Sequence, residues 1–195
     1  MFSVLKQKPR YTYEEYQQRS MLGYRRYTVG YLTVKVKRKG SEEWETVCKD
    51  KHNLGTTVGQ DLLHRVMYIN IAAETSGWGC NYIALSTNAG GASAAHQSLG
   101  TNTGQVTTNE ITTGGLARTG AAGLDTRTHT AGTNTSTLEE TFVASAGHTA
   151  VQLTGLFNNT VASATSIMAH ENTFTATTLA SGDELRVTWT ITSTF

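Results

Sequence analysis

The sequence predicts a mainly β protein, an antiparallel β-sandwich of jelly-roll type with one covering helix and an extended N-terminal arm and hairpin. Apolar residues alternate with Thr and Arg from Leu185 to Ile191, as in a strand with one buried face. Such a strand needs a second sheet to cover its apolar side. Thr accounts for 26 of the 95 residues from 101 to 195, which suits the solvent-facing positions of further strands.

The charges divide the chain into two parts. Residues 1–52 hold 12 Lys and Arg against 6 Asp and Glu, a net of +6, and residues 53–195 hold 4 against 9, a net of −5, which together give the +1 of the whole chain. We therefore expect a basic N-terminal arm and β-hairpin over residues 1–52 and a β-sandwich domain over residues 53–195. On this division the sandwich folds without the hairpin. Basic arms commonly lie on an acidic neighbour, nucleic acid or another subunit, and a solvated hairpin is the alternative.

Residues 1–26 contain the one proline and four of the eight tyrosines, but few aliphatic side chains. This segment cannot form its own core and needs a partner surface to order it. Glu14 and Glu15 lie among its basic residues and no RNA-binding motif is present, so nucleic acid is not the expected partner. Mixtures of Tyr and Arg are common in protein interfaces. The predicted interface residues are Arg10, Tyr11, Tyr13, Tyr16, Arg25, Arg26 and Tyr27, with Trp44 as an exposed anchor in the hairpin.

Residues 27–48 are predicted to form the hairpin, because Leu32, Val34 and Val36 alternate with polar residues before a turn at 38–41. A two-stranded hairpin is marginal by itself. It should therefore dock on the body or on a neighbouring copy.

Residues 56–73 are the one predicted helix. Thr57 and Gln60 form a capping-box pattern, and apolar side chains recur on one face of the segment. A single amphipathic helix beside many strands is expected to cover an open end or face of the sandwich.

The remaining chain alternates strands and turns. Residues 87–115 are almost wholly Gly, Ala, Ser, Thr and Asn, and a loop of this length is usually a binding loop or a segment that wraps a neighbour. Turn residues at 180–183 make the run 167–174 the expected hairpin partner of 185–191. The predicted strands are 81–86, 116–121, 126–131, 136–143, 149–157, 167–174 and 185–191.

Few patterns indicate chemistry. Cys48 and Cys80 have no CxxC spacing, and the adjacent His170 and Glu171 would point to opposite faces of a strand. No nucleophile elbow or phosphate-binding loop is present. A glycosidase-like pair of carboxylates stays open, but no spacing singles out a pair. We therefore expect no enzyme, no cofactor and no metal site. No apolar run could cross a bilayer and no signal peptide is recognisable, so we expect no membrane attachment.

The segments NYIALSTNAGG, EITTGGLAR, HTAGTNTSTLEETF, GLFNN and ENTFTATTLASGDELRVTWTITSTF, in this order, resemble a group of small structural proteins of tailed bacteriophages. The resemblance covers roughly residues 54–195. It implies a virion component assembled in the host cytoplasm, foremost an auxiliary head protein that decorates or cements the capsid. Its partners would be the major capsid protein or other virion subunits, and the protein would be a homo-oligomer or bound to the capsid lattice.

Two other functions stay open on the sequence alone. The chain could be a neck, tail or fibre component that joins the particle through the same arm. It could also be a carbohydrate-binding or receptor-binding module on the same sandwich, which would show an exposed aromatic platform near polar loops.

Overall fold

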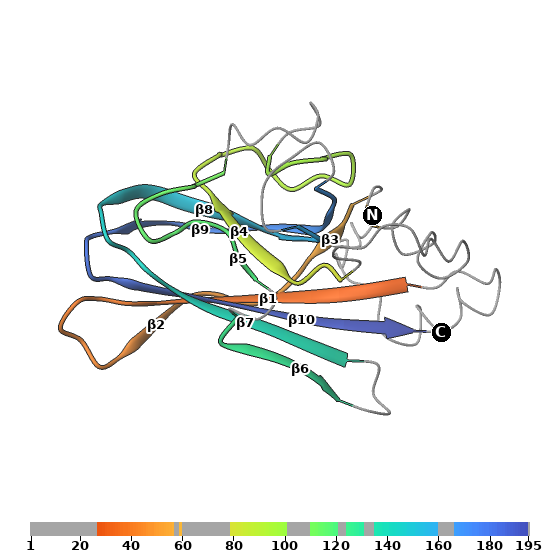
Figure 1. Cartoon of the computed structure of the whole chain (residues 1–195), viewed down its shortest axis with the longest axis horizontal. Coiled ribbons are helices and arrows are strands. Elements are labelled where there is room, and N and C mark those ends of the chain that lie inside the picture. Colours follow the sequence, from red (N-terminus) through yellow and green to blue (C-terminus); the bar gives the residue numbers. More distant parts are fainter. Residues whose placement is uncertain are drawn as a thin grey trace, which may run out of the picture.

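The structure, a computed structural model, describes residues 27–56, 59, 79–100, 110–120, 124–130, 135–159 and 166–194. The described chain is mainly β and forms two antiparallel five-stranded sheets (Figure 1). Sheet A has the order β2 (Trp44–His52), β1 (Tyr27–Lys37), β10 (Glu184–Thr194), β7 (Thr135–Val143), β6 (Thr126–Thr130). Sheet B has the order β3 (Leu54–Gly55), β9 (Met168–Leu179), β8 (His148–Phe157), β4 (Tyr82–Ser86), β5 (Thr119–Gly120).

The inner faces of the two sheets share one hydrophobic core. The predicted alternation in β10 is confirmed, since Leu185, Val187 and Trp189 are fully buried in this core. Leu138 and Phe142 of β7 lie beside them, and sheet B contributes side chains from β4, β8 and β9. Each sheet thus covers the apolar side of the other. The contributions of sheet B are Ile83, Leu85, Val151, Leu156, Phe174 and Leu179.

β1 is an internal strand of sheet A, which corrects the expected division of the chain. It lies between β2 and β10 and pairs with β10 along its whole length. Its inward side chains Leu32, Val34 and Val36 are fully buried. The predicted hairpin therefore docks on the body as part of the same sheet. Between residues 52 and 53 the chain passes from sheet A to sheet B, so this point is not the edge of an independent unit.

The passage between the sheets is fixed by Asn53, which is buried. Its side-chain Oδ1 accepts a hydrogen bond from Gly30 N at 2.7 Å, and its backbone N donates to Gly30 O at 2.8 Å. A Cβ on residue 30 would lie only 2.6 Å from the Asn53 amide, so this close approach requires glycine. Residues 52 to 54 are thereby tied to the middle of sheet A.

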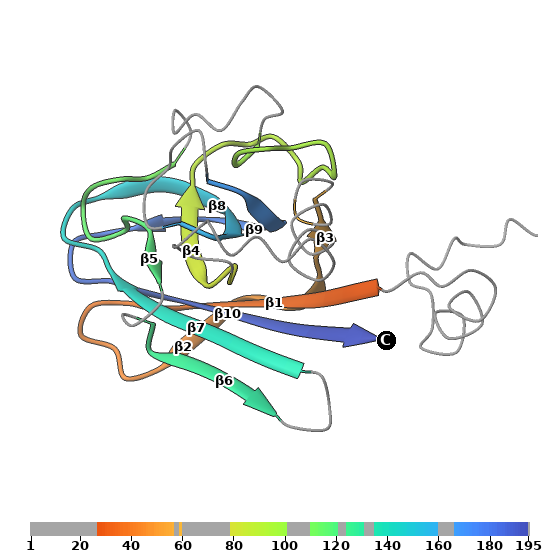
Figure 2. The ribbon, with the colours of Figure 1, turned by 45° about the vertical axis from the view of Figure 1, so that its right-hand side comes forward.

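β9 and β10 do not form the expected hairpin. β9 lies in sheet B and β10 in sheet A, and the turn at 180–183 is a corner between the sheets (Figure 2). Asp183 holds this corner, because its carboxylate accepts hydrogen bonds from Ala180 N at 3.0 Å, Lys39 N at 2.8 Å and Arg38 Nη1 at 2.9 Å. Burial by itself would raise the pKa of Asp183, but these hydrogen bonds outweigh it and hold the pKa below its usual value.

The edge strand β2 is irregular. Its pairing with β1 shifts register twice, between Leu32 and Val34 and between Val34 and Lys35. Asp50 has a positive φ of 45°, and it exchanges hydrogen bonds of 3.1 and 3.2 Å with the Thr33 hydroxyl. Bulges of this kind twist an edge and hinder the addition of another strand.

The helix predicted over residues 56–73 lies, apart from Thr56 and Gly59, outside the described residues. Gly59 N donates to the Thr56 hydroxyl at 3.0 Å, a contact that an N-cap makes with the third helical residue. The strand predicted over 116–121 is reduced to the two residues of β5.

Candidate functional site

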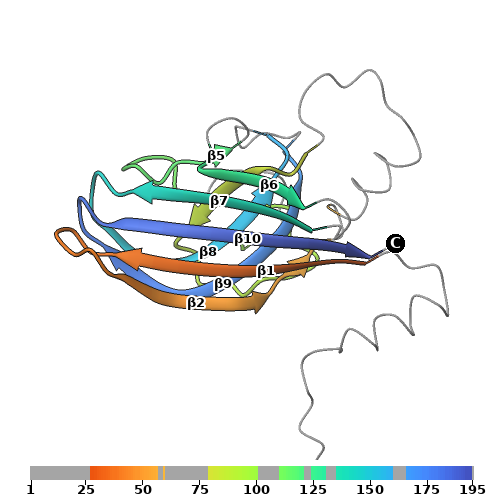
Figure 3. The ribbon, with the colours of Figure 1, turned by 90° about the horizontal axis from the view of Figure 1, so that it is seen from below.

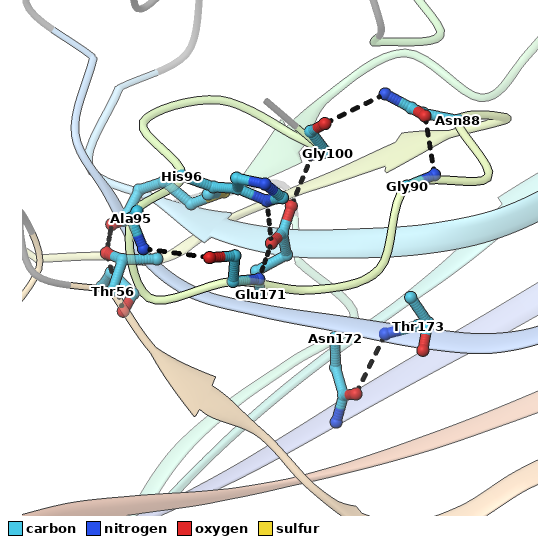
Figure 4. A network of polar contacts seen from close by, with 12 residues as sticks. Thr56, Asn88, Gly90, Ala95, His96, Gly100, Glu171, Asn172 and Thr173 are labelled. Carbon is cyan, nitrogen blue, oxygen red and sulfur yellow. Dashed lines mark hydrogen bonds and ion pairs between the residues drawn. The ribbon is translucent and has the colours of Figure 1, made fainter. Parts of the chain in front are cut away.

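A cluster of polar contacts surrounds the carboxylate of Glu171 on β9 (Figure 4). The Glu171 side chain is fully buried, on the side of sheet B that faces away from the core. Ser93 N and His96 Nδ1 lie 3.0 and 2.8 Å from its Oε2, and Gly100 N donates to its Oε1 at 2.6 Å. A buried carboxylate is costly without such donors, and charge-assisted hydrogen bonds are among the strong ones.

All three donors belong to one loop, residues 87–100, which lies along the outer face of sheet B (Figure 1). Asn88 organises its first turn, because Gly90 N donates to Asn88 Oδ1 at 2.8 Å and Asn88 Nδ2 donates to Gly100 O at 3.3 Å. Leu99 is buried against Ala84, Leu153, Phe157 and Met168, a second and smaller apolar cluster. The loop predicted to bind or wrap a neighbour therefore covers its own sheet over these residues.

The pair of Glu171 and His96 has a familiar chemical use. A carboxylate on imidazole Nδ1 orients the ring and leaves Nε2 to act as a base in catalytic dyads. Here the same carboxylate also accepts hydrogen bonds from two backbone N–H groups of the loop. In the structure these contacts fasten the loop to β9. We call Glu171, Ser93, His96 and Gly100 the loop clasp.

A buried ion pair holds residues 110–118, where the chain returns to the sheet after this loop. Arg118 and Glu110 form a bidentate ion pair with distances of 2.9 and 2.5 Å, and both side chains are nearly inaccessible. Arg118 also donates to Asn159 O at 2.9 Å and to the Ser166 hydroxyl at 2.8 Å, and its guanidinium lies 3.9 Å from the centre of the Phe157 ring. These contacts attach residues 110–118 to the β8–β9 connection.

The outer face of sheet A, in contrast, has no described segment over it (Figure 3). Trp44, the predicted exposed anchor, is on this face but is partly buried. The Arg186 guanidinium lies 4.2 Å from the centre of its ring and Lys37 Nζ lies 5.4 Å from it. These two cations use ring surface that a sugar would need for stacking.

Of the eight predicted interface residues, the structure describes Tyr27 and Trp44, and these two lie apart. Tyr27 begins β1 and Trp44 lies opposite Lys37 at the other end of that strand. Ten residues of strand separate the two ends, or about 34 Å. The other six predicted residues lie outside the described part of the chain: Arg10, Tyr11, Tyr13, Tyr16, Arg25 and Arg26.

Comparison of the chain with protein-family models, with curated proteins and with solved structures finds no match. Within the described ranges, no group of three or more His, Cys, Asp or Glu is placed to hold a metal ion. Among the same residues, no helix has the length and apolar character required to cross a membrane.

Two titratable side chains point into the core from opposite sheets. His170 of β9 lies 6.3 Å from the Trp189 ring, and burial lowers the pKa of His170 to about 4. Glu140 of β7 is also buried, and burial together with the nearby Asp125 raises the pKa of Glu140 to about 7. Both groups are therefore held in their neutral forms near pH 5 to 6.

These two groups should tilt the pH dependence of stability in opposite directions. Because the folded-state pKa of Glu140 is raised from 4.5, its stabilising contribution is complete below pH 4.5 and is lost as the pH rises toward 7. Because the pKa of His170 is lowered from 6.5, its contribution is complete above pH 6.5 and is lost as the pH falls toward 4. Between pH 4.5 and 6.5 the two slopes nearly cancel in the wild type.

We expect Glu140→Gln to become more stable by about 2 kcal/mol as the pH rises from 4.5 to 6.5, and His170→Gln to become less stable by about the same amount. Urea denaturation of both variants at several pH values measures these slopes. Wild-type profiles in both variants would contradict the assigned environments.

Proposed function

We propose that this protein is a non-enzymatic structural subunit of a tailed-bacteriophage virion, foremost a capsid decoration protein that binds the major capsid protein. Attachment through the N-terminal residues is supported by the position of Tyr27, where the described chain begins. β1 starts at Tyr27, opposite Thr194 near the end of β10, and runs toward the corners at 144–147 and 180–183. The N-terminal residues therefore join the body at the end opposite those corners, which are closed by hydrogen bonds.

The composition of residues 1–26 fits an attachment segment. Six Lys and Arg against two Glu give this segment a net charge of +4 (6 − 2). Fully extended, 26 residues span about 85 Å. Such a segment can reach across a joint between neighbouring subunits, while the resemblance of residues 54–195 to phage structural proteins supports the virion context.

The detailed architecture belongs to the same proposal. We infer a jelly-roll-like sandwich, because β7 to β8 and β9 to β10 both cross between the sheets at one end, as strand pairs do in that fold. Along the chain, the predicted helix over 56–73 would come after β3 and before β4, both strands of sheet B.

Copy number per particle tests the proposal. Quantitative mass spectrometry of purified virions is expected to find this chain in hundreds of copies. About a dozen copies would move it to the neck, tail or fibres, and absence from the particle would refute a virion role.

A deletion of residues 1–26 tests the attachment segment. We expect the shortened protein to keep the unfolding transition of the full chain and to be missing from particles. A variant with Arg10, Arg25 and Arg26 changed to Gln controls for charge and should bind with reduced occupancy. Full incorporation of the deletion variant would show that attachment uses the body instead.

A further inference from the structure

The outward side chains of sheet A form a regular array of threonines. On β1, β7 and β10 these threonines alternate with buried core residues. Those of β6 lie opposite outward positions of β7. The register aligns Thr128, Thr137 and Thr190 with Tyr31 in one row across four strands. We call this surface the threonine face. Its members are Thr33, Thr126, Thr128, Thr135, Thr137, Thr188, Thr190 and Thr192.

The outer face of sheet A also holds exposed apolar side chains. Among the described residues, the exposed large hydrophobic side chains are Tyr31, with 38% of its surface accessible, and Val143, with 55%. Both point outward from sheet A, Tyr31 beside Thr190 and Val143 beside Glu184. The outer face of sheet B differs, because the loop fastened by the clasp buries its apolar residues.

Charged side chains on the outer face of sheet A lie toward the end near the corners and reach its middle row, where Glu139 accepts a hydrogen bond from Thr188 at 2.7 Å and Asp50 is bonded to Thr33. Lys37 Nζ lies 2.8 Å from a Glu184 oxygen, and Arg186 Nε lies 3.8 Å from a Glu139 oxygen. The rows from Tyr31 toward the other end hold hydroxyls, methyl groups and the rings of Tyr31 and His52, whose centres lie 5.8 Å apart. Depletion of charged side chains is typical of the centre of a protein interface, and these rows have that composition.

We propose that the threonine face packs against the same face of a second copy of this chain. A threonine hydroxyl both donates and accepts hydrogen bonds, so the row of Thr128, Thr137 and Thr190 is complementary to a copy of itself, whereas a row of one charge is not. Four other hydroxyls of the face are already bonded within the sheet, those of Thr33, Thr135, Thr188 and Thr192. Outward β-branched methyl groups can interdigitate when two sheets stack about 10 Å apart.

The outer face of sheet A, its charged rows included, approaches the size that such a partner requires. Five strands about 4.8 Å apart and about nine residues long cover about 20 Å by 30 Å, or about 600 Å². A standard interface buries about 800 Å² on each partner, and side-chain relief adds to the flat area. The pairing does not depend on a virion role, since it concerns two copies of the protein alone.

Analytical ultracentrifugation of the purified full-length chain tests the pairing, with protein up to about 100 μM. The wild type is expected to be a dimer. The double variant Thr137→Lys and Thr190→Lys puts two like charges on paired positions in the centre of the face, and it should weaken association by at least about tenfold. The matched control is Thr175→Lys, an exposed position on β9 of sheet B, which should leave the dimer intact.

A second variant, Tyr31→Lys, guards against misfolding of the double variant, and the unfolding transition of each is recorded. A wild type that stays monomeric throughout would overturn the proposal. So would a dimer that persists in folded variants of both kinds, because the contact would then lie elsewhere.

Discussion

We expect a chain that begins at residue 53 not to fold. The truncation removes β1 from the interior of sheet A, and with it the fully buried Leu32, Val34 and Val36. Truncating one buried aliphatic side chain costs about 2 to 5 kcal/mol, whereas a whole domain is stable by only about 5 to 15 kcal/mol. The loss also leaves β10 with an unpaired edge.

Circular dichroism during heating measures this outcome. We expect no cooperative transition for residues 53–195, and a wild-type transition for residues 27–195, which keep every described strand. A cooperative transition of the shorter chain near the wild-type midpoint would contradict this expectation. It would support the independent domain over residues 53–195 that the charge distribution predicts.

Replacement of Glu171 by Ala should lower the free energy of unfolding by about 4 kcal/mol, because loss of one partner from a buried charged contact costs about 3 to 5 kcal/mol. The N–H groups of Ser93 and Gly100 would lose their acceptor. We expect faster amide hydrogen exchange in the loop 87–100, with little change in β1 and β10. Urea denaturation and hydrogen exchange measure the two effects.

The matched control is Glu184→Ala, which removes a partly exposed carboxylate paired with Lys37. Such pairs contribute about 0 to 1 kcal/mol. Equal losses in the two variants, or unchanged exchange in the loop of Glu171→Ala, would show that the clasp does not hold the loop.

The alternation of apolar and polar residues predicted where the strands lie better than it predicted which strands are neighbours in the sheets. It identifies the inward side chains of Leu185, Val187 and Trp189, because a strand repeats every two residues. It contains no information on which strand lies alongside, and so the corner at 180–183 resembles a hairpin turn in sequence. The interior position of β1 was missed for the same reason, since its strong charge contrast with residues 53–195 comes from outward side chains such as Lys35 and Lys37.

The loop clasp left no signal in the sequence. His96 and Glu171 are 75 residues apart, and no pattern at that separation marks a pair. The sequence did predict that His170 and Glu171 face opposite ways, and this is confirmed, because His170 lies by Trp189 and Glu171 meets the loop. Trp44 was expected to be exposed and is partly buried instead. Its cover comes partly from Arg186, which only the folded sheet brings near.

The two bulges of β2 limit how many copies one sheet can join. Growth of a continuous sheet from molecule to molecule requires a usable edge on both sides of each subunit, as in a fibre. Sheet A ends in β6 on one side and in the irregular β2 on the other, where Asp50 adopts its positive φ. Edge pairing between the described strands of sheet A is therefore expected to join two copies at most, through β6.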